Sequence, residues 1–206
     1  LADMSVTDLQ KALTGKRVSL SPRISGNSES LSGSSTVKDL ETLLQLNYLY
    51  FTAPRRDEES YQTLISILES QLANRDKNPK VAFNDSIQMM TSNNSERTVI
   101  FTKKLLEKVS LDKALEVYKA RFANPADFTF FFVGNVNPED AAFKAQVCQW
   151  LGGLKANKKK EKVVDHQVRV PLGKQQNYFT QKMETKTASN RIQYTSYNMP
   201  YTLAND

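Results

Sequence analysis

Helix formation is most strongly indicated by the stretch Thr36-Val-Lys-Asp-Leu-Glu-Thr-Leu-Leu-Gln-Leu-Asn-Tyr-Leu-Tyr-Phe-Thr-Ala-Pro54. Thr36 and Asp39 stand at the spacing of a capping box, which satisfies free amides in the first turn of a helix. The leucines and tyrosines that follow leave almost no polar face, so we expect the far end of this helix to be buried in the domain. Pro54 ends the helix because it lacks the amide that the helical ladder needs.

Helical spacing of apolar residues recurs on both sides of this stretch. Asn78 and Pro79 form an N-cap and first-turn pair, Ser110 stands where it can cap the next helix, and Asn137 with Pro138 opens the last one. Together with the spacing, these signals predict helices at residues 6–13, 40–51, 61–72, 79–90, 102–108, 111–122 and 138–151.

Strand patterns are fewer. Residues 17–24 and 28–34 alternate in type around a Gly26-Asn27 turn and predict a hairpin. The run Phe128-Thr-Phe-Phe-Phe-Val133 is apolar on both faces, which favours a central strand covered on each side. Two alternating stretches, 177–183 and 191–197, predict two further strands. We therefore expect an α+β fold in which helices pack on an antiparallel-type sheet.

Domain organisation follows from where the charge lies. The formal net charge is +6, and the segment 155–162, with five lysines and one glutamate, carries +4 of it, which leaves +2 for everything else. A nucleic-acid surface spreads its basic residues over a face and interleaves aromatic ones. We therefore predict a domain at residues 1–154, a solvated basic linker at 155–175 and the first strands of a following domain at 176–206, with no nucleic-acid partner.

One histidine, His166, and one cysteine, Cys148, limit the chemistry of this chain. A structural zinc site needs four Cys or His ligands, an H-x-x-E-H peptidase helix needs two histidines, and a disulfide needs two cysteines. A hydrolase triad would have to recruit His166, which follows the lysine run. The Ser-rich stretch around Gly33 lacks the P-loop and Rossmann patterns. We expect no catalytic or metal-ligating residue here, an inert half-buried thiol at Cys148, and a linker position for His166.

Other charged groups have structural explanations. The pair Arg55-Arg56 is expected to form surface salt bridges rather than an anion site. Acidic residues at 57–59 and 139–140 stand in first turns of predicted helices, where they complement the helix dipole. Glu69 stands alone on a strongly amphipathic helix, so its carboxylate is expected to be solvated.

No apolar run approaches the roughly 18 to 20 residues that a membrane span requires, so no membrane span is expected. The chain begins at Leu1 rather than at a methionine, which suggests a piece of a longer protein whose targeting signal cannot be read here.

Several segments taken together resemble one family. The stretch 32–54, followed by Arg55-Arg-Asp-Glu-Glu59, resembles the helical region of the pitrilysin-like (insulinase-type) zinc metallopeptidases. The run Leu115-Glu-Val-Tyr-Lys-Ala-Arg-Phe-Ala-Asn-Pro-Ala-Asp-Phe-Thr-Phe-Phe-Phe-Val-Gly-Asn135, with a helix ending at Trp150-Leu-Gly-Gly-Leu154, is similar to the family's Tyr-rich helix and core strand. The order and spacing of these segments over residues 5 to about 205 carry the resemblance.

The resemblance implies a LuxS/mitochondrial-processing-peptidase-like α+β fold, repeated as four domains in two halves that close like a clamshell around a peptide. In the catalytic half, the family's H-x-x-E-H motif supplies two zinc ligands and a Glu base, and a further Glu completes the site. No residue here matches that motif, so zinc is expected in the parent's catalytic half and not in this chain. The expected partners are that half, or a partner subunit, and peptide substrates, in the periplasm or cell envelope.

Two origins are compatible with the missing motif. The chain could be cut from the catalytic half, in which case Glu69 would correspond to the further Glu ligand. Alternatively, it belongs to the non-catalytic C-terminal half, as a third-domain type lacking its N-terminal part, which the segments 9–15 and 32–36 resemble more closely. We adopt the second origin. A related alternative is a scaffold or assembly subunit without proteolytic activity.

Overall fold

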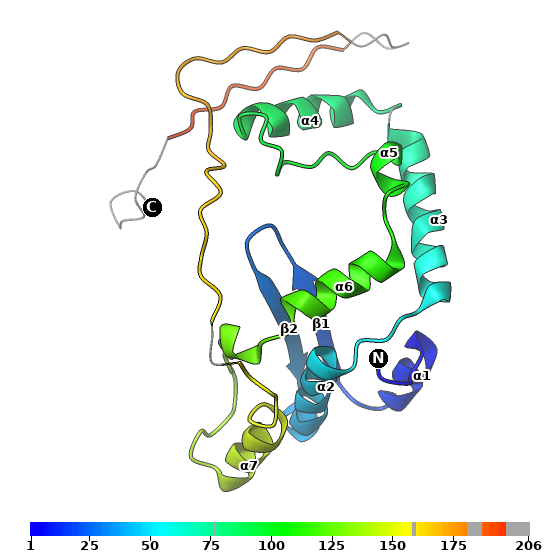
Figure 1. Ribbon diagram of the computed structural model, residues 1–206, viewed down its shortest axis with the longest axis vertical. Helices are drawn as coiled ribbons and strands as arrows, with labels where there is room; N and C mark the ends of the chain where they lie inside the picture. Colours follow the sequence, from blue (N-terminus) through cyan, green and yellow to red (C-terminus); the bar gives the residue numbers. More distant parts are fainter. Residues whose placement is uncertain (76, 158–159, 181–186, 197–206) are drawn as a thin grey trace. The chain divides into compact units, whose positions relative to one another are not determined.

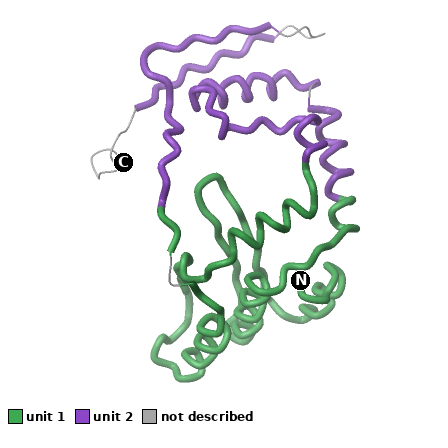
Figure 2. Tube along the Cα trace, in the orientation of Figure 1, with its two compact units in different colours: residues 1–63, 109–162 green, residues 64–108, 163–206 purple. Residues whose placement is uncertain are grey.

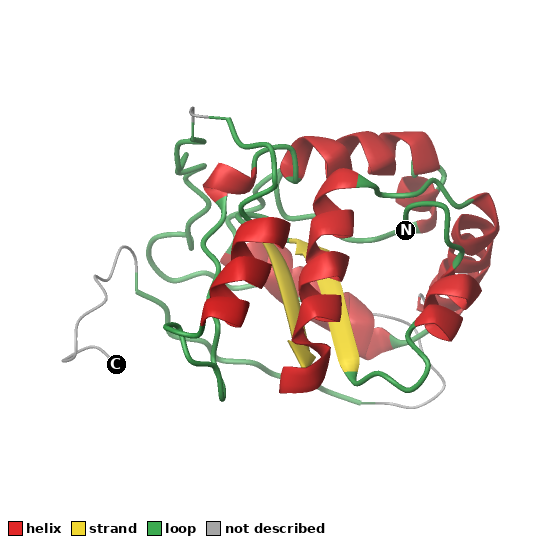
Figure 3. Cartoon of the chain, turned by 90° about the horizontal axis from the view of Figure 1, so that it is seen from below, coloured by secondary structure: helices red, strands yellow, loops and turns green. Residues whose placement is uncertain are grey.

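The computed structural model describes residues 1–75, 77–157, 160–180 and 187–196. The chain divides into two compact units, each built from two stretches of sequence (Figure 2). Within the described ranges the chain consists mainly of helices and loops, with one small antiparallel sheet of two strands in unit 1 (Figure 3). Unit 1 comprises Leu1–Thr63 and Val109–Lys162, and unit 2 comprises Leu64–Lys108 and Val163–Asp206.

The predicted hairpin is confirmed in unit 1. Its strands pair antiparallel with Ile24 opposite Glu29, and the amide of Ser25 donates to the carbonyl of Ser28 at 2.8 Å, which closes a two-residue turn. Gly33 is required in the second strand, because a Cβ there would lie 2.3 Å from a backbone oxygen of the first. The strands are β1 (Val18–Ile24) and β2 (Glu29–Ser35).

Helix α2 (Leu40–Thr52) follows the hairpin and packs against both strands (Figure 1). The predicted capping box is not formed. Instead, the hydroxyl of Thr36 donates to Oδ2 of Asp39 at 2.7 Å, and the backbone amide of Arg17 donates to the same oxygen at 3.0 Å. These two bonds hold the pKa of Asp39 below its ordinary value. Asp39 therefore joins the start of the helix to the start of the hairpin.

Aromatic rings fill the interior of unit 1 beside α2. Phe51 lies edge-to-face on Phe122 and Phe128, with ring centroids 5.6 and 4.9 Å apart, and Phe122 is only 2% exposed. Phe122 directly follows helix α6 (Leu111–Arg121), whose Tyr118 stacks on it and donates its hydroxyl to the backbone oxygen of Tyr50 at 2.9 Å. Burial raises the pKa of Tyr118, so this tyrosine stays neutral as a donor.

Helix α7 (Ala141–Trp150) begins later than predicted. Asp140, rather than Asn137, is its N-cap and accepts from the amide of Ala142 at 3.0 Å. The helix packs on α2, and its Trp150 lies edge-to-face on Tyr48 at 5.9 Å. The helix ends before a glycine pair, as expected.

The run 128–133 is not part of a sheet in the described structure, so the predicted central strand is wrong for this chain by itself. Its inner side contacts Phe51, but Phe131 and Val133 are 84% and 99% exposed. A strand needs hydrogen-bonding neighbours, and the described residues supply none here.

Helix α3 (Glu58–Arg75) includes residues of both units, and the rest of unit 2 contains two further helices. The predicted cap is confirmed: Oδ1 of Asn78 accepts from the amide of Lys80 at 3.0 Å, with Pro79 in the first turn. One terminal nitrogen of Arg75 lies 2.7 and 2.6 Å from the two carboxylate oxygens of Asp85. The helices are α4 (Pro79–Thr91) and α5 (Lys103–Leu106).

The two strands predicted beyond the linker are not observed where the chain is described. Residues 177–180 and 191–196 are in no sheet, and residues 181–183 and 197 lie outside the described ranges. Phe179 instead packs on Phe83 of α4, with ring centroids 6.3 Å apart. None of the described helices is long and apolar enough to cross a membrane.

We predict that Phe122→Ala lowers the free energy of unfolding of unit 1 by about 3–5 kcal/mol, because it empties a fully buried ring site. The matched control is Phe131→Ala, which removes the same side chain from an exposed position and should change stability by less than about 0.5 kcal/mol. Denaturant unfolding followed by the fluorescence of Trp150 measures both. Equal losses would contradict the described core.

We predict that Asp39→Asn lowers the melting temperature at pH 7 by about 2–4 °C, because it removes the charged acceptor of the bonds from Thr36 and Arg17. Since the folded-state pKa of Asp39 is lowered, its ionised form stabilises the fold above the ordinary pKa of about 4, and this stability is lost as the pH falls through the folded value. The variant should therefore show a flatter loss of stability below pH 4. Asp3→Asn, at an exposed position, is the control, and identical pH profiles for all three proteins would refute the role of Asp39.

Candidate functional site

Zinc does not fit the residues that the structure describes. No group of three or more His, Cys, Asp or Glu side chains within these ranges is arranged to hold a metal ion. His166, Cys148 and Glu69 are each exposed, so the half-buried thiol expected at Cys148 is a wrong prediction. The whole sequence contains a single histidine, which by itself cannot complete a zinc site.

The charged pair after α2 has the structural role that was predicted. Arg56 lies 2.9 Å from Glu58 and 2.8 Å from Asp112, and Arg55 lies 3.4 Å from Asp57. The hydrogen bond from Arg56 holds the pKa of Asp112 below its ordinary value. These contacts tie the start of α3 to the start of α6 and leave no arginine pair dedicated to an anion.

A hollow of about 440 Å³ in unit 2 lies beside α3 and α4. It is open to solvent, and its charged group, Arg75, is paired with Asp85, while Asn78 caps α4. Because these polar groups stabilise the fold, they are not available to orient a substrate. The hollow is lined by Leu68, Gln71, Leu72, Asn74, Arg75, Asn78, Val81 and Phe101.

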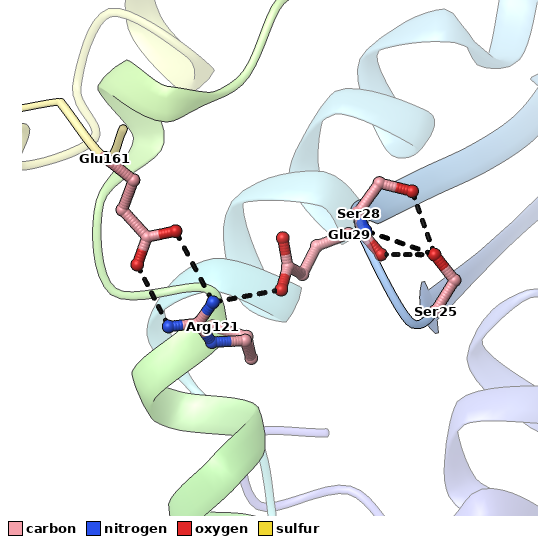
Figure 4. A network of polar contacts seen from close by, with 5 residues as sticks. All are labelled: Ser25, Ser28, Glu29, Arg121 and Glu161. Carbon is pink, nitrogen blue, oxygen red and sulfur yellow. Dashed lines mark hydrogen bonds and ion pairs between the residues drawn. The ribbon is translucent and has the colours of Figure 1, made fainter. Parts of the chain in front are cut away.

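A network of polar contacts in unit 1 surrounds Arg121, at the end of α6 (Figure 4). Its Nη2 donates to Glu161 at 2.9 Å, and its Nη1 lies 3.4 Å from both Glu161 and Glu29. Glu29 belongs to β2, whereas Glu161 belongs to the basic segment that follows α7. One guanidinium therefore joins a strand, a helix end and a loop that are far apart in the sequence.

Two neighbours of Arg121 extend this network. The amide of Asn157 donates to Oδ1 of Asn124 at 2.7 Å, and the amide of Glu161 donates to Oδ1 of Asp127 at 2.9 Å. The side chains of Asn124 and Asp127 are themselves bonded at 2.9 Å. We call Arg121, Asn124 and Asp127 the linker clamp. The lysine-rich segment is exposed in its described residues, as predicted, but the clamp fixes its course against unit 1.

Sequence patterns could not identify the linker clamp. Asn124-Pro125 signals only the short helix η2 (Pro125–Asp127), in which Asn124 accepts from the amide of Ala126. The bonds to Asn157 and Glu161 span more than thirty residues, and nothing in the local pattern marks them. The described contacts of Arg121, Asn124 and Asp127 hold elements of unit 1 together.

Comparisons with known proteins find similarity to proteases. A curated plant protein, the zinc protease PQQL-like protein of Arabidopsis thaliana, is 32% identical over 117 residues, which are 56% of this chain and 12% of that protein. The periplasmic protease PqqL from Escherichia coli superposes with a TM-score of 0.67 at 22% identity. The ferredoxin protease FusC, solved in complex with Arabidopsis ferredoxin, gives 0.66 at 18% identity. Each superposition covers 82% of this chain and 18% of the other. No protein-family model matches.

The fold is thus one that occurs inside insulinase-like proteases. The chain is a relative of the pitrilysin-like zinc proteases, as the sequence resemblance indicated. The matched stretch covers about an eighth of the length of the curated relative, which is therefore much longer than the units described here.

We predict that Arg121→Gln loosens the lysine-rich segment. An exposed ion pair contributes up to about 1 kcal/mol, so loss of these contacts should raise cleavage at Lys160 and Lys162 by about two- to five-fold. Limited proteolysis with a lysine-specific protease, read by mass spectrometry, measures this. Glu116→Gln, which breaks only the pair with Lys113 on the same helix, is the control and should leave cleavage unchanged. Equal cleavage in both variants would rule out the clamp.

Proposed function

We propose that this chain is a non-catalytic portion of a zinc-dependent metallopeptidase and forms part of the chamber that encloses its peptide substrates. One observation carries the proposal: a relative of zinc proteases has a single histidine in all 206 residues. The family's H-x-x-E-H motif needs two, so the hydrolytic centre must be supplied by other residues.

The chemistry would then come from the catalytic half of the same protein or from a partner subunit. Zinc there would lower the pKa of a bound water, and a glutamate would take its proton as the scissile carbonyl is attacked. This chain would contribute a rigid wall. The ion pairs of Arg56, Arg75 and Arg121 support this role, because each arginine joins separate segments of one unit.

The proposed substrates and cellular location of the parent protein are based on the same relatives. FusC was solved with ferredoxin, and PqqL is a periplasmic protease. By analogy with these two proteins, we propose that the parent of this chain acts on peptide or protein substrates. We propose that it does so in the periplasm or cell envelope.

We predict that the 206-residue chain, purified after incubation with zinc, contains less than about 0.1 equivalents of the metal and cleaves no quenched fluorescent peptide, because its lone histidine cannot complete a site. Elemental analysis and the peptide assay test this. Stoichiometric zinc with chelator-sensitive cleavage would overturn the proposal.

A peptide-cleavage assay on the longest polypeptide that the gene encodes distinguishes a protease from a scaffold subunit. Chelator-sensitive peptide cleavage by that protein, alone or with a co-purified subunit, supports the peptidase. If it contains no H-x-x-E-H motif, acquires no catalytic partner and cleaves nothing, an assembly subunit is the correct assignment.

A further inference from the structure

Helix α4 has two opposite faces with different neighbours. Val81 and Asp85 lie one turn apart on the face toward α3, where Val81 lines the hollow and Asp85 pairs with Arg75. Phe83 and Ser86 lie on the other side of the helix, because successive residues are rotated by about 100°. The packing of α4 on α3 therefore leaves the face of Phe83 and Ser86 open to another contact.

An extended segment of the same unit contacts this second face. The ring of Phe179 lies on that of Phe83, with centroids 6.3 Å apart, and the side-chain amide of Asn177 donates to the hydroxyl of Ser86. Tyr178, between them, is 85% exposed, whereas Phe179 is 46% exposed. Side chains two residues apart thus meet the helix while the one between them faces solvent, as expected for an extended peptide.

This contact is small enough to be reversible. No backbone hydrogen bond joins residues 177–180 to another described residue, so the segment is held on α4 by side chains. An aromatic pair favours such a contact by only about two- to ten-fold. A tethered segment competes with free ligand at an effective concentration of about a millimolar, which a peptide in an enclosed space can match.

We propose that the face of α4 formed by Phe83 and Ser86 is a docking surface for an extended peptide with an aromatic side chain. Residues 177–179 occupy it until a peptide substrate displaces them. This rests on the proposed function, since the displacing ligand is a substrate of the parent protease. The resident segment shows the chemistry that the surface accepts, which is a side-chain donor for Ser86 and, two residues later, a ring for Phe83.

Photo-crosslinking of the 206-residue chain tests the proposal. The probe is a peptide with the sequence Lys174-Gln-Gln-Asn-Tyr-Phe-Thr180, in which benzoylphenylalanine replaces the phenylalanine. Phe179→Ala removes the resident ring, so labelling of α4, located by mass spectrometry, should rise at least about three-fold over the unaltered chain. Tyr178→Ala removes an exposed ring from the same segment and is the matched control, which should leave labelling unchanged.

Competition experiments on the Phe179→Ala variant identify the ligand chemistry. An unlabelled peptide of the same sequence, with its phenylalanine, should reduce labelling by at least about half at millimolar concentration. The same peptide with alanine in place of the phenylalanine should not compete. Adding Phe83→Ala should remove the excess labelling, while circular dichroism checks that the helices are retained.

Equal labelling of the unaltered chain and the two single variants would overturn the inference, as would competition that is indifferent to the ring. The peptide-cleavage assay on the longest encoded polypeptide is independent of this result. Cleavage without labelling of α4 would remove the docking surface and keep the peptidase. Ring-dependent labelling without cleavage would keep a peptide-binding surface and remove the peptidase.

Discussion

The packing around Phe51 is the interaction on which unit 1 depends. This side chain of α2 contacts Phe122 after α6 and the inner rings of the run 128–133. The same helix reaches the hairpin through Asp39 and α7 through Tyr48. Because α2 is apolar on nearly every side, it is stable only where other elements cover it, and the hairpin and α7 both pack on it.

Where helices cover only one side of an extended segment, apolar groups remain exposed. In unit 1 these are Phe131 and Val133, and in unit 2 they include Tyr178, Ile192 and Tyr194. Exposed apolar groups of this size are typical of a surface that meets another part of a protein. It is consistent with a chain that spans a small fraction of its relatives.

The charged residues are used for connection. Arg56 joins α3 to α6, Arg75 joins α3 to α4, and Arg121 joins β2 to the segment after α7. Each arginine therefore holds two or more elements of its own unit together.

The sequence by itself determined the helices and the hairpin, because caps, turns and helical spacing act over a few residues. Asn78 and Ser110 cap the helices that they were predicted to cap, and the two-residue turn formed as expected. The sequence also limited the site chemistry, because a chain with one histidine cannot contain a motif that needs two. Only the tertiary structure decided that Asp39 bonds to Arg17 instead of closing a capping box, and that Asn124 and Asp127 hold the lysine-rich segment. The run 128–133 has a strand's sequence without a strand's hydrogen bonds. Pairing depends on a distant partner, and no local pattern shows whether that partner is present.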